Sequence, residues 1–545
     1  MSKRIVVICS VVLMLVMLFG CGSPAASNPG AGTAAPNATS NPSGPSDPGT
    51  PAGPERSKIV NIAFSEKPRT MDPHNSTDQG SETAVRMCYE TLIYSDHLGQ
   101  GYHPMLAESW EIAPDGTYWT FKLRQGVTFN NGEPFDADDV VCTFERLIER
   151  GDELGQAMTQ WADLESVEKI DQYTVRVNYT QPYPVAGNAY RGTYIIPNEA
   201  YEEYGDDLFN LQYMYGTGPW IMEEWVDGQY AHYTKNPNYW DKENYDPYFE
   251  EVYIRHVSEP STAVAAHLTG DIDVYCPSGG IDHDLLPLYN GTEQTTEIFG
   301  MNTNFNMYMQ FQMKEGSPWT DFDVRRAFNA SIDRQLIIDA VLGGGKMPIG
   351  IYAEGVVGYD NTIDPYEYDP ELARQLLADS SYDGREIELM SYPNMPKAEE
   401  VCLSIADMAN QVGFNMTVKV EESGVFNTRR QTGEYDVFAG HVAFPDGMCY
   451  RQLNTNILND VYKNNYKNEE LFDAVRHYNT EMDDALRNGY AQQANRLIRD
   501  ELAPQTVFAH LNVTYARNYG VVGVDFYPDG MFNFAKVDYD PADVR

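Results

Sequence analysis

The segment from Leu106 to Arg146 constrains the fold most, because its local pattern changes several times without interruption. Apolar and polar residues alternate up to Ile112, and a Pro-Asp-Gly triplet then predicts a tight turn. The alternation resumes at Trp119, so the two runs predict a β-hairpin. Asp136 suits a helix N-cap, and the acidic residues after it favour the positive end of a helix dipole. We therefore expect a hairpin followed by a helix with one apolar face.

The same segment resembles a signature of the peptide/nickel class of extracytoplasmic solute-binding proteins, which serve ATP-binding-cassette importers. Other motifs of that family occur before and after this segment, in the order in which the family has them, so the resemblance covers 58–545. They include Tyr89-Glu90-Thr91-Leu92, Gly216-Thr217-Gly218-Pro219-Trp220, Asn236-Pro237-Asn238-Tyr239-Trp240 and Tyr368-Asp369-Pro370-Glu371-Leu372-Ala373. The resemblance implies an α/β, periplasmic-binding-protein-like fold with two lobes, a hinge between them and an extra subdomain on the first lobe.

The start of the chain has the composition of a leader and a spacer. Two basic residues and an apolar run predict a secretory signal at 1–21. It ends in a Leu-Phe-Gly-Cys sequence that resembles a bacterial lipobox, which makes Cys21 the expected site of lipidation. The apolar run is shorter than the ~20 residues of a membrane-spanning helix, which disfavours a transmembrane anchor. Residues 22–57, rich in Pro, Gly and Ser, predict a disordered tether.

The rest of the chain is long enough for more than one hydrophobic core. An extended segment at Asn302–Met313 is expected to cross from one lobe to the other. We therefore expect lobe I at 58–305, with its subdomain at about 94–210. Lobe II is then expected at 306–505, and 506–545 is expected to return to lobe I.

Local periodicity predicts the elements that build these lobes. Strands are expected at Ile59–Phe64, Val252–Ile254, Ile387–Met390, Met416–Val420 and Thr506–Leu511. Helices are expected at Ala84–Ile93, Ser261–Leu268, Leu336–Leu342 and Val401–Val412. A further helix begins after Asp369, which suits an N-cap before a proline at the first helical position.

Composition excludes several classes of function. The 545 residues carry a net charge of −42, which disfavours nucleic acid as a partner and favours solubility. The seven cysteines lack a C-x-x-C pair, so neither a zinc cluster nor a disulfide framework is indicated. No nucleophile elbow, H-E-x-x-H motif or phosphate loop is present, and we expect no cofactor, metal or catalytic group.

The resemblance implies that ligand-binding residues come from the loop after the first strand and from the crossing segment. Ser65 and Glu66 begin that loop, whose continuation resembles a family segment that contacts ligands. Tyr308 and Gln310 lie on the crossing segment, where the floor of the cleft is expected.

A second group of candidates lies toward the C-terminal end of lobe II. Arg429 and Arg430 are candidates for a ligand carboxylate, because a guanidinium binds it bidentately; a solvated helix face is the alternative. Peptide-binding members of the family carry an acid in a Gly-Trp…Asp segment, which holds the α-ammonium of the peptide. In this chain His441 occupies the Trp position, Phe444 occupies the acid position, and Asp446 lies two residues further on.

This departure leaves two alternatives for the ligand. Asp446 takes the role of the acid if the loop is remodelled, and is otherwise an ordinary turn residue. Without that anchor, a ligand lacking a free ammonium is favoured, and an aromatic side chain there would stack on a sugar or a peptide side chain.

These features predict a lipid-anchored receptor at the outer face of the cytoplasmic membrane. It is expected to act as a monomer that captures an oligopeptide and passes it to the permease subunits of an importer. The alternatives are an oligosaccharide or a nickel chelate bound on the same scaffold, and a secreted hydrolase.

Overall fold

The computed structural model describes residues 56–545 except 77, 96–100, 152, 155–160, 162, 211–213, 394, 445–446 and 528–531. The predicted signal peptide with Cys21, nearly all of the tether, and Asp446 lie outside the described residues. Residues 1–56 and Ser57–Arg545 separate as two units, and the description below concerns the second. Among the described residues, no helix is long and apolar enough to cross a membrane.

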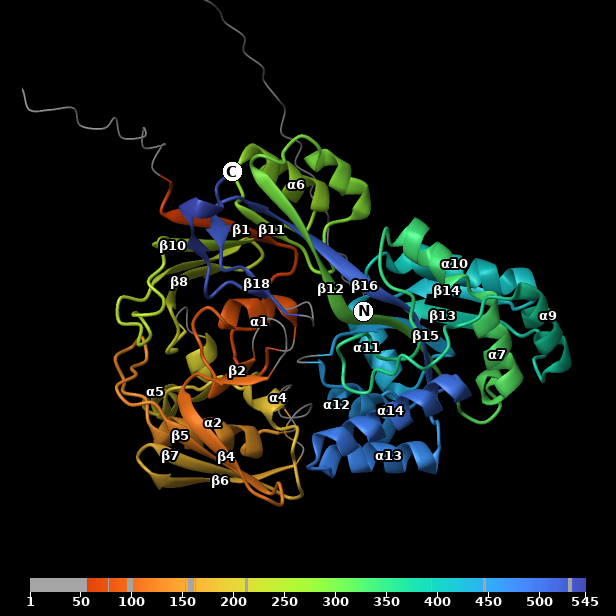
Figure 1. Ribbon diagram of the computed structural model, residues 1–545, viewed down its shortest axis with the longest axis horizontal. Helices are drawn as coiled ribbons and strands as arrows, with labels where there is room; N and C mark the ends of the chain where they lie inside the picture. Colours follow the sequence, from red (N-terminus) through yellow and green to blue (C-terminus); the bar gives the residue numbers. More distant parts are fainter. Residues whose placement is uncertain are drawn as a thin grey trace, which may run out of the picture. The chain divides into compact units, whose positions relative to one another are not determined.

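A ten-stranded mixed sheet organises the unit, in the order β14-β13-β15-β12-β16-β11-β1-β10-β9-β8 (Figure 1). At the lobe I end lie β1 (Ile59–Phe64), β8 (Trp220–Val226), β9 (Tyr230–Lys235), β10 (Glu251–His256) and β11 (Val274–Cys276). At the lobe II end lie β13 (Ile387–Ser391), β14 (Met416–Val420) and β15 (Val437–Val442). The sheet therefore runs through both halves, and burial alternates along β9 and β10 as the two-residue period requires.

Two long antiparallel strands connect the halves. They are β12 (Thr296–Phe311) and β16 (Gln505–Asn518). Their register shifts between Asn302 and Asn306, an irregularity that bends a strand pair locally. The predicted crossing segment at Asn302–Met313 is thus confirmed as a strand up to Phe311.

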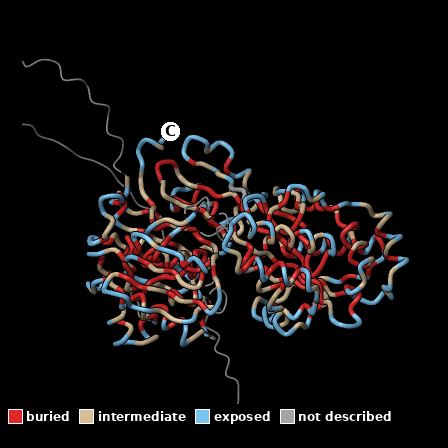
Figure 2. Tube along the Cα trace, turned by 60° about the horizontal axis from the view of Figure 1, so that its bottom comes forward, coloured by how far each residue is buried: buried red, intermediate tan, exposed pale blue. Residues whose placement is uncertain are grey.

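Separate hydrophobic cores cover the two ends of the sheet, and Figure 2 shows buried stretches throughout the unit. One core joins residues of the lobe I strands with Val513 and Tyr515 of β16. The other packs Met309 of β12 against helices at the lobe II end. These helices are α7 (Phe322–Ser331), α9 (Pro370–Asp379) and α10 (Ala398–Val412). Asp369 caps α9, as predicted.

The remaining helices of the lobe II end are α11 (Ser423–Thr432), α12 (Tyr450–Gln452), α13 (Glu469–Thr480) and α14 (Asp484–Glu501). The helix expected at Leu336–Leu342 is a short α-turn, α8 (Arg334–Leu336), continued by a π-turn at Ile337–Val341. At the lobe I end, α6 (Pro260–Thr269) ends at Gly270, whose left-handed φ of 84° suits a residue without a Cβ.

The subdomain confirms the predicted hairpin and helix. Its four-stranded sheet has the order β4-β5-β7-β6, with β4 at Ala107–Ile112, β5 at Tyr118–Leu123, β6 at Leu164–Asp171 and β7 at Thr174–Tyr179. The helix α2 spans Ala137–Glu149. Trp119 and Phe121 are buried beneath it together with Phe144. The short helices α4 (Gly187–Tyr190) and α5 (Asn198–Tyr204) follow the sheet along the chain.

A capping box fixes the start of α2. The Asp136 carboxylate accepts a hydrogen bond from the Asp138 backbone N–H at 2.8 Å, and the Asp139 carboxylate accepts one from the Asp136 N–H at 2.8 Å. Burial raises the pKa of Asp139 to about 7, against hydrogen bonds from backbone N–H groups that lower it. The helix therefore begins at a position that sequence chemistry specifies locally.

Asp136→Ala is expected to lower the free energy of unfolding by about 1 kcal/mol, because the helix loses its N-cap acceptor. Asp138→Ala is the matched control: its side chain pairs with Lys169 at the surface, and its loss should cost only a few tenths of a kcal/mol. Denaturant unfolding of both variants measures the difference. Equal stabilities would mean that the capping box contributes nothing.

The helix predicted at Ala84–Ile93 is wrong in its position. The helix α1 spans Gln79–Val85, is capped by Asp78, and gives way to turns and the short strand β2 (Ile93–Ser95). Close backbone packing explains the early end. The Gly218 N–H donates to the Cys88 carbonyl at 2.8 Å, and a Cβ on Gly216 would meet that carbonyl at 2.0 Å. Tertiary contacts of the 216–218 loop thus override local helix propensity.

The described cysteines are all free. Cys88 and Cys402 are buried, whereas Cys142 is only partly buried.

Candidate functional site

The candidate site lies where the parallel strands β13 and β15 end side by side. Ligands of open α/β sheets bind beyond the carboxyl ends of such strands. Tyr392 directly follows β13, and His441 is the penultimate residue of β15. Their side chains meet, with the Tyr392 hydroxyl 3.0 Å from Nδ1 of His441. Two residues far apart in sequence are thereby brought to one edge of the sheet.

Aromatic rings and one guanidinium gather around this pair. Tyr392 stacks on Phe426 of α11 at 4.4 Å between ring centroids. Arg430, one helical turn beyond Phe426, lies 5.3 Å from the Phe426 ring centroid and 4.5 Å from that of Tyr462. We call the set the Arg430 cluster; its members are Tyr308, Tyr392, Phe426, Arg430, His441 and Tyr462.

Arg430 has an unusual environment for a cation in so acidic a chain. No ion pair with a carboxylate is formed by Arg430 within the described part of the chain, and its buried Nε has no hydrogen-bond partner there. Cation–π contacts stabilise the guanidinium but leave its hydrogen-bond donors unused. The cluster therefore presents a positive charge that is available for an anionic group.

The titratable neighbours of Arg430 are held neutral. Burial, and then the charge of Arg430, lowers the pKa of His441 to about 4. Burial raises the pKa of Tyr392 to about 12, although Arg430 opposes that shift. Burial likewise raises the pKa of Tyr308. At neutral pH, Arg430 is therefore the charged member of the cluster.

The crossing strand β12 contributes the two residues predicted from it. Tyr308 belongs to the cluster, and its ring packs edge-on against Phe438 at 6.1 Å between centroids. Gln310 lies two residues further along and so faces the same side of the strand. Its side chain is fully buried, and neither amide atom has a hydrogen-bond partner among the described residues. A buried amide without partners costs free energy unless water or a ligand satisfies it.

The loop after β1 approaches the cluster from the lobe I end. The Ser65 hydroxyl accepts a hydrogen bond from the Ser278 N–H at 2.8 Å. Burial raises the pKa of Glu66, partly offset by a hydrogen bond from Ser278. The Glu66 carboxylate is near enough to Tyr392 to contribute to the raised pKa of its hydroxyl. The charge of Glu66 therefore acts on the cluster, while its hydrogen-bond partner Ser278 lies at the lobe I end.

Two predicted residues are engaged elsewhere. Arg429 donates to Glu388 at 2.6 Å and to Glu421 at 2.7 Å. Phe444 is buried against Tyr352, and both its N–H and its carbonyl are hydrogen-bonded to the Asn304 side chain. Neither side chain is free to meet a solute without breaking these contacts. Asp446, the third predicted member of that loop, and the lipidation residue Cys21 lie outside the described residues.

Sequence reasoning missed three members of the cluster, which are Tyr392, Phe426 and Tyr462. A signal for Tyr392 was present, since it directly follows a strand predicted at Ile387–Met390. A signal for Phe426 was also present, because residues four apart on a helix share a face and Arg430 was already a candidate. Tyr462 lies in an irregular segment whose position depends on tertiary contacts.

A buried ion-pair network positions the loop after β1. Arg146 of α2 binds Asp72 bidentately at 3.0 and 2.8 Å and also donates to Asp206 at 3.0 Å. Burial would raise the pKa of Asp72, but hydrogen bonds and charge from Arg146 lower it. His74 Nδ1 lies 2.7 Å from Arg146 Nη1, and its Nε2 lies 2.8 Å from the Tyr194 carbonyl. His74 is therefore neutral, accepting from Arg146 and donating to Tyr194.

This arrangement predicts a specific pH dependence. Burial and the charge of Arg146 lower the pKa of His74 from 6.5 to about 4. As the pH falls, His74 therefore takes up a proton in the unfolded chain before it does so in the folded protein. The contribution of neutral His74 to the free energy of unfolding is lost as the pH falls from about 6.5 to about 4. The loss should reach about 3 kcal/mol. His74→Gln should show a shallower loss of unfolding free energy between pH 7 and pH 4.5. Parallel profiles for the two proteins would contradict this origin.

The described residues contain no group of three or more His, Cys, Asp or Glu side chains that would hold a metal ion. The Arg430 cluster also contains no activated nucleophile paired with a base. Its chemistry is that of binding: rings for stacking, hydroxyl and imidazole groups for hydrogen bonds, and one cation.

Comparison with known proteins identifies the family. A family model described as "Bacterial extracellular solute-binding proteins, family 5 Middle" matches residues 101–453. The chain belongs to this family of extracytoplasmic binding proteins, and it is therefore not an enzyme. The predicted alternative of a secreted hydrolase is thereby removed.

Relatives and solved structures agree with this assignment. The probable D,D-dipeptide-binding periplasmic protein DdpA of Escherichia coli (strain K12) is 26% identical over 487 residues, covering 86% of this chain and 91% of that protein. The periplasmic oligopeptide-binding protein OppA of Haemophilus influenzae is 26% identical over 507 residues, covering 87% and 88%. DppA from Helicobacter pylori, solved with the peptide STSA, superposes with a TM-score of 0.75 at 22% identity, covering 88% and 98%. The predicted two-lobed α/β fold is confirmed.

Proposed function

We propose that this protein captures an oligopeptide between its two lobes and delivers it to the permease subunits of an ATP-binding-cassette importer. Family membership supports the role of a receptor, and the relatives named for dipeptides and oligopeptides support the solute class. The same proposal places lobe I at 58–305 and 506–545 and lobe II at 306–505, joined by β12 and β16.

Closure of the lobes around the solute is supported by contacts other than the two connecting strands. Tyr183 of the subdomain packs against Tyr450 of α12 at 5.3 Å between ring centroids. Lys397, before α10, lies 3.3 Å from Asp282 of the lobe I end. Such contacts between lobes enclose a bound solute, exclude water and strengthen its polar interactions.

The observation that carries the proposal is Arg430, a partly desolvated guanidinium without a carboxylate partner among the described residues. A peptide carboxylate would pair with it bidentately and satisfy its free donors. The Tyr392 and Phe426 rings would pack against neighbouring side chains of the peptide, and the Gln310 amide is available for a peptide backbone group.

The other end of the peptide needs an acidic partner. Glu66 approaches the cluster from the lobe I end and is a candidate for the α-ammonium. Asp446, the residue predicted from the family pattern, is the second candidate. Replacing each acid with its amide and titrating free and N-acetylated peptides would discriminate between them. If one of these acids binds the α-ammonium, N-acetylation of the peptide should weaken binding to the wild type. It should have no such effect on the variant in which that acid is replaced with its amide.

An oligosaccharide is the second candidate solute, because stacked rings such as Tyr392 and Phe426 suit the apolar face of a sugar. Nickel chelates remain an alternative: NikZ from Campylobacter jejuni, solved with Ni(L-His), shares the fold at 20% identity with a TM-score of 0.74. The charge of Arg430 favours a carboxylate-bearing peptide over a neutral sugar.

A thermal-shift screen of tetrapeptides, neutral oligosaccharides and nickel–histidine tests the solute class. A ligand at about 100 times its Kd should stabilise the folded protein by about 2.7 kcal/mol. Peptides alone should raise the melting temperature. A shift produced only by sugars or by the chelate would refute the peptide and leave the receptor role intact.

We also propose that the receptor is anchored by a lipid on Cys21, which the tether at 22–57 separates from the folded unit, and that it acts as a monomer. Cys21→Ser should release the protein from membranes into the soluble fraction after expression in bacteria. Retention of this variant in detergent-extractable membranes would contradict the anchor.

A further inference from the structure

A pocket at the lobe II end contains no member of the Arg430 cluster. It is bounded by α7, α9, the end of α14 and the segment before α9; Figure 1 shows these helices at the lobe II end. Its cavity measures about 130 Å³, whereas about 10–15 Å³ of such space holds one water molecule. The pocket therefore has room for a small solute.

Tyr366, in the segment before α9, lines this pocket and has an unsatisfied hydroxyl group. The residue is only 7% exposed, and its buried hydroxyl has no hydrogen-bond partner among the described residues. A buried hydroxyl without a partner costs free energy, which a water molecule or a ligand beside it would offset. The hydroxyl is thus a donor available to a solute in the pocket.

Two guanidinium groups lie over the ring of Tyr366. The guanidinium of Arg334 is 4.1 Å from the ring centroid, and that of Arg499 is 4.0 Å from it. Cation–π contacts of this kind stabilise both cations. Burial lowers the pKa of Arg334 to about 10, and the charge of Arg499 acts in the same direction. Positive charge is therefore concentrated at Tyr366.

The hydrogen bonds of the two guanidinium groups go to neutral acceptors. Within the described part of the chain, Arg334 donates only to backbone carbonyl, amide and hydroxyl oxygens. Arg499 donates to the backbone carbonyls of Asp364 and Pro365, both at 3.2 Å. The buried Nε of Arg499 has no partner among the described residues. Both groups keep their charge, and Arg499 has a donor to spare.

Acidic side chains that neighbour these residues in sequence do not pair with the two cations. Three of them are exposed to solvent, which hydrates and screens their charge: Asp364, Glu367 and Asp500. Of these, Glu367 also lines the pocket, but it forms no ion pair with a described residue. Two further carboxylates are engaged elsewhere, Asp369 as the cap of α9 and Glu501 with Arg325.

The remaining lining combines a third cation with an aliphatic wall. Arg326 pairs with Asp323 at 3.4 Å, but the two side chains are 42% and 45% exposed, and such a surface pair is weak. The aliphatic residues are Ala330, Leu372, Leu376 and Leu502. Guanidinium and hydroxyl donors suit a carboxylate, and the aliphatic wall suits a short hydrocarbon chain.

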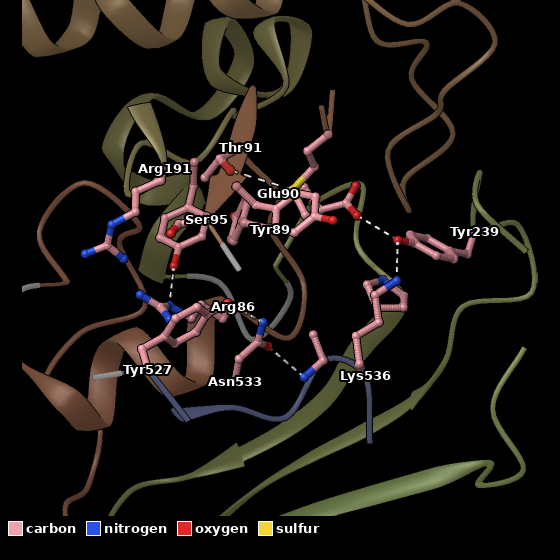
Figure 3. Close-up of a pocket in the computed structure, with 15 residues that line it drawn as sticks. Arg86, Tyr89, Glu90, Thr91, Ser95, Arg191, Tyr239, Tyr527, Asn533 and Lys536 are labelled. Atoms are coloured by element: carbon pink, nitrogen blue, oxygen red, sulfur yellow. Dashed lines mark hydrogen bonds between the residues drawn. The ribbon is translucent and has the colours of Figure 1, made fainter. Parts of the chain in front are cut away.

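Another pocket with basic side chains, at the lobe I end, lacks this combination (Figure 3). There Arg86 pairs with Glu82 at 3.2 Å, and the Tyr239 hydroxyl links Lys536 to the buried carboxylate of Glu90. Carboxylates therefore already accompany these cations. The cavity there is also smaller, at about 70 Å³.

We infer that the pocket around Tyr366 binds a short aliphatic carboxylate. Its carboxylate group would meet the Tyr366 hydroxyl and the Arg499 guanidinium, and its chain would lie against the leucines. A ligand there would connect α7, α9 and α14. This inference does not depend on the peptide proposed for the Arg430 cluster.

Butyrate and its neutral amide butyramide are suitable probes, titrated calorimetrically at constant ionic strength into the full-length Arg430→Met protein. This background lacks the carboxylate site proposed above, so binding that persists in it does not involve the charge of Arg430. Butyrate should bind saturably at one site. Butyramide should bind at least tenfold more weakly, because it cannot pair with a guanidinium as an anion does.

Tyr366→Phe in the same background should weaken butyrate binding about tenfold, because it removes one hydrogen bond to a charged group. The melting temperature of the free protein should not fall, since the hydroxyl that is removed has no partner among the described residues. The matched control is Tyr368→Phe, at a side chain that is 50% exposed and lies outside the lining. It should bind butyrate with unchanged affinity.

Equal binding of butyrate and butyramide, or no binding of butyrate to the Arg430→Met protein, would overturn the inference. Unchanged affinity in Tyr366→Phe, or an equal loss in Tyr368→Phe, would place butyrate outside this pocket. Displacement of butyrate by an equimolar amount of inorganic phosphate would refute the aliphatic carboxylate and favour an inorganic oxyanion.

Discussion

Replacing Arg430 with methionine is expected to weaken peptide binding by about 100-fold or more and to leave the melting temperature of the free protein almost unchanged. Methionine keeps the apolar contacts with Phe426 and Tyr462 and removes the charge. Hydrogen bonds to a charged group contribute about 1.5–3 kcal/mol each, so a bidentate pair accounts for at least two orders of magnitude. Stability should not fall, because Arg430 forms no ion pair within the described residues.

The neighbouring Arg429→Met is the matched control. Arg429 lies one residue away on the same helix, but its guanidinium pairs with Glu388 and Glu421. Its loss should leave peptide affinity within about twofold of the wild type and reduce stability by at most about 1 kcal/mol. Calorimetric titration with one tetrapeptide measures both variants. Equal losses of affinity would show that α11 as a whole matters, and not the charge of Arg430.

Arg146→Met is expected to destabilise the protein by about 3–5 kcal/mol, because it leaves Asp72 buried without its partner. The Arg146 side chain is only 1% exposed and serves Asp72, Asp206 and His74 together. Loss of the network should also loosen the loop that carries Glu66, and so weaken peptide binding. Denaturant unfolding followed by tryptophan fluorescence measures the stability.

Arg150→Met is the control for this network. Arg150, the C-cap residue of α2, has a side chain that is 32% exposed, and it pairs with Glu153 and with Asp206, the exposed member of the network. A half-exposed pair contributes about 0–1 kcal/mol, so this variant should remain close to the wild type. If both variants lost the same stability, a general loss of charge on α2 would explain the effect and the buried network would not.

The sequence predicted most of the architecture because many of its elements are specified locally. The hairpin before α2 has its own turn chemistry, and Asp136 and Asp369 cap their helices as their patterns indicate. The prediction of a helix at Ala84–Ile93 was wrong because the end of this helix is not specified locally. Its position depends on the 216–218 loop, which is distant in sequence and packs against the Cys88 carbonyl.

The candidate site was predicted only in part, because the roles of its residues also depend on contacts between segments that are distant in sequence. Arg429 and Arg430 are equivalent in sequence, and their roles separate only when Glu388 and Glu421 arrive from β13 and the end of β14. Phe444 was expected in contact with solute, but its ring fills a core position against Tyr352. The ring stack of Tyr392 and Phe426 joins the end of β13 to α11, and no local pattern encodes such a contact.

The central claim is that Arg430 binds a carboxylate of a captured peptide. A cycle of four calorimetric titrations tests it most directly, with a tetrapeptide and its C-terminal amide each titrated into the wild type and Arg430→Met. Amidation should weaken binding to the wild type by about 100-fold and have little further effect on the variant, since the two changes remove the same interaction. Equal losses on amidation in both proteins would contradict the claim and place the peptide carboxylate elsewhere.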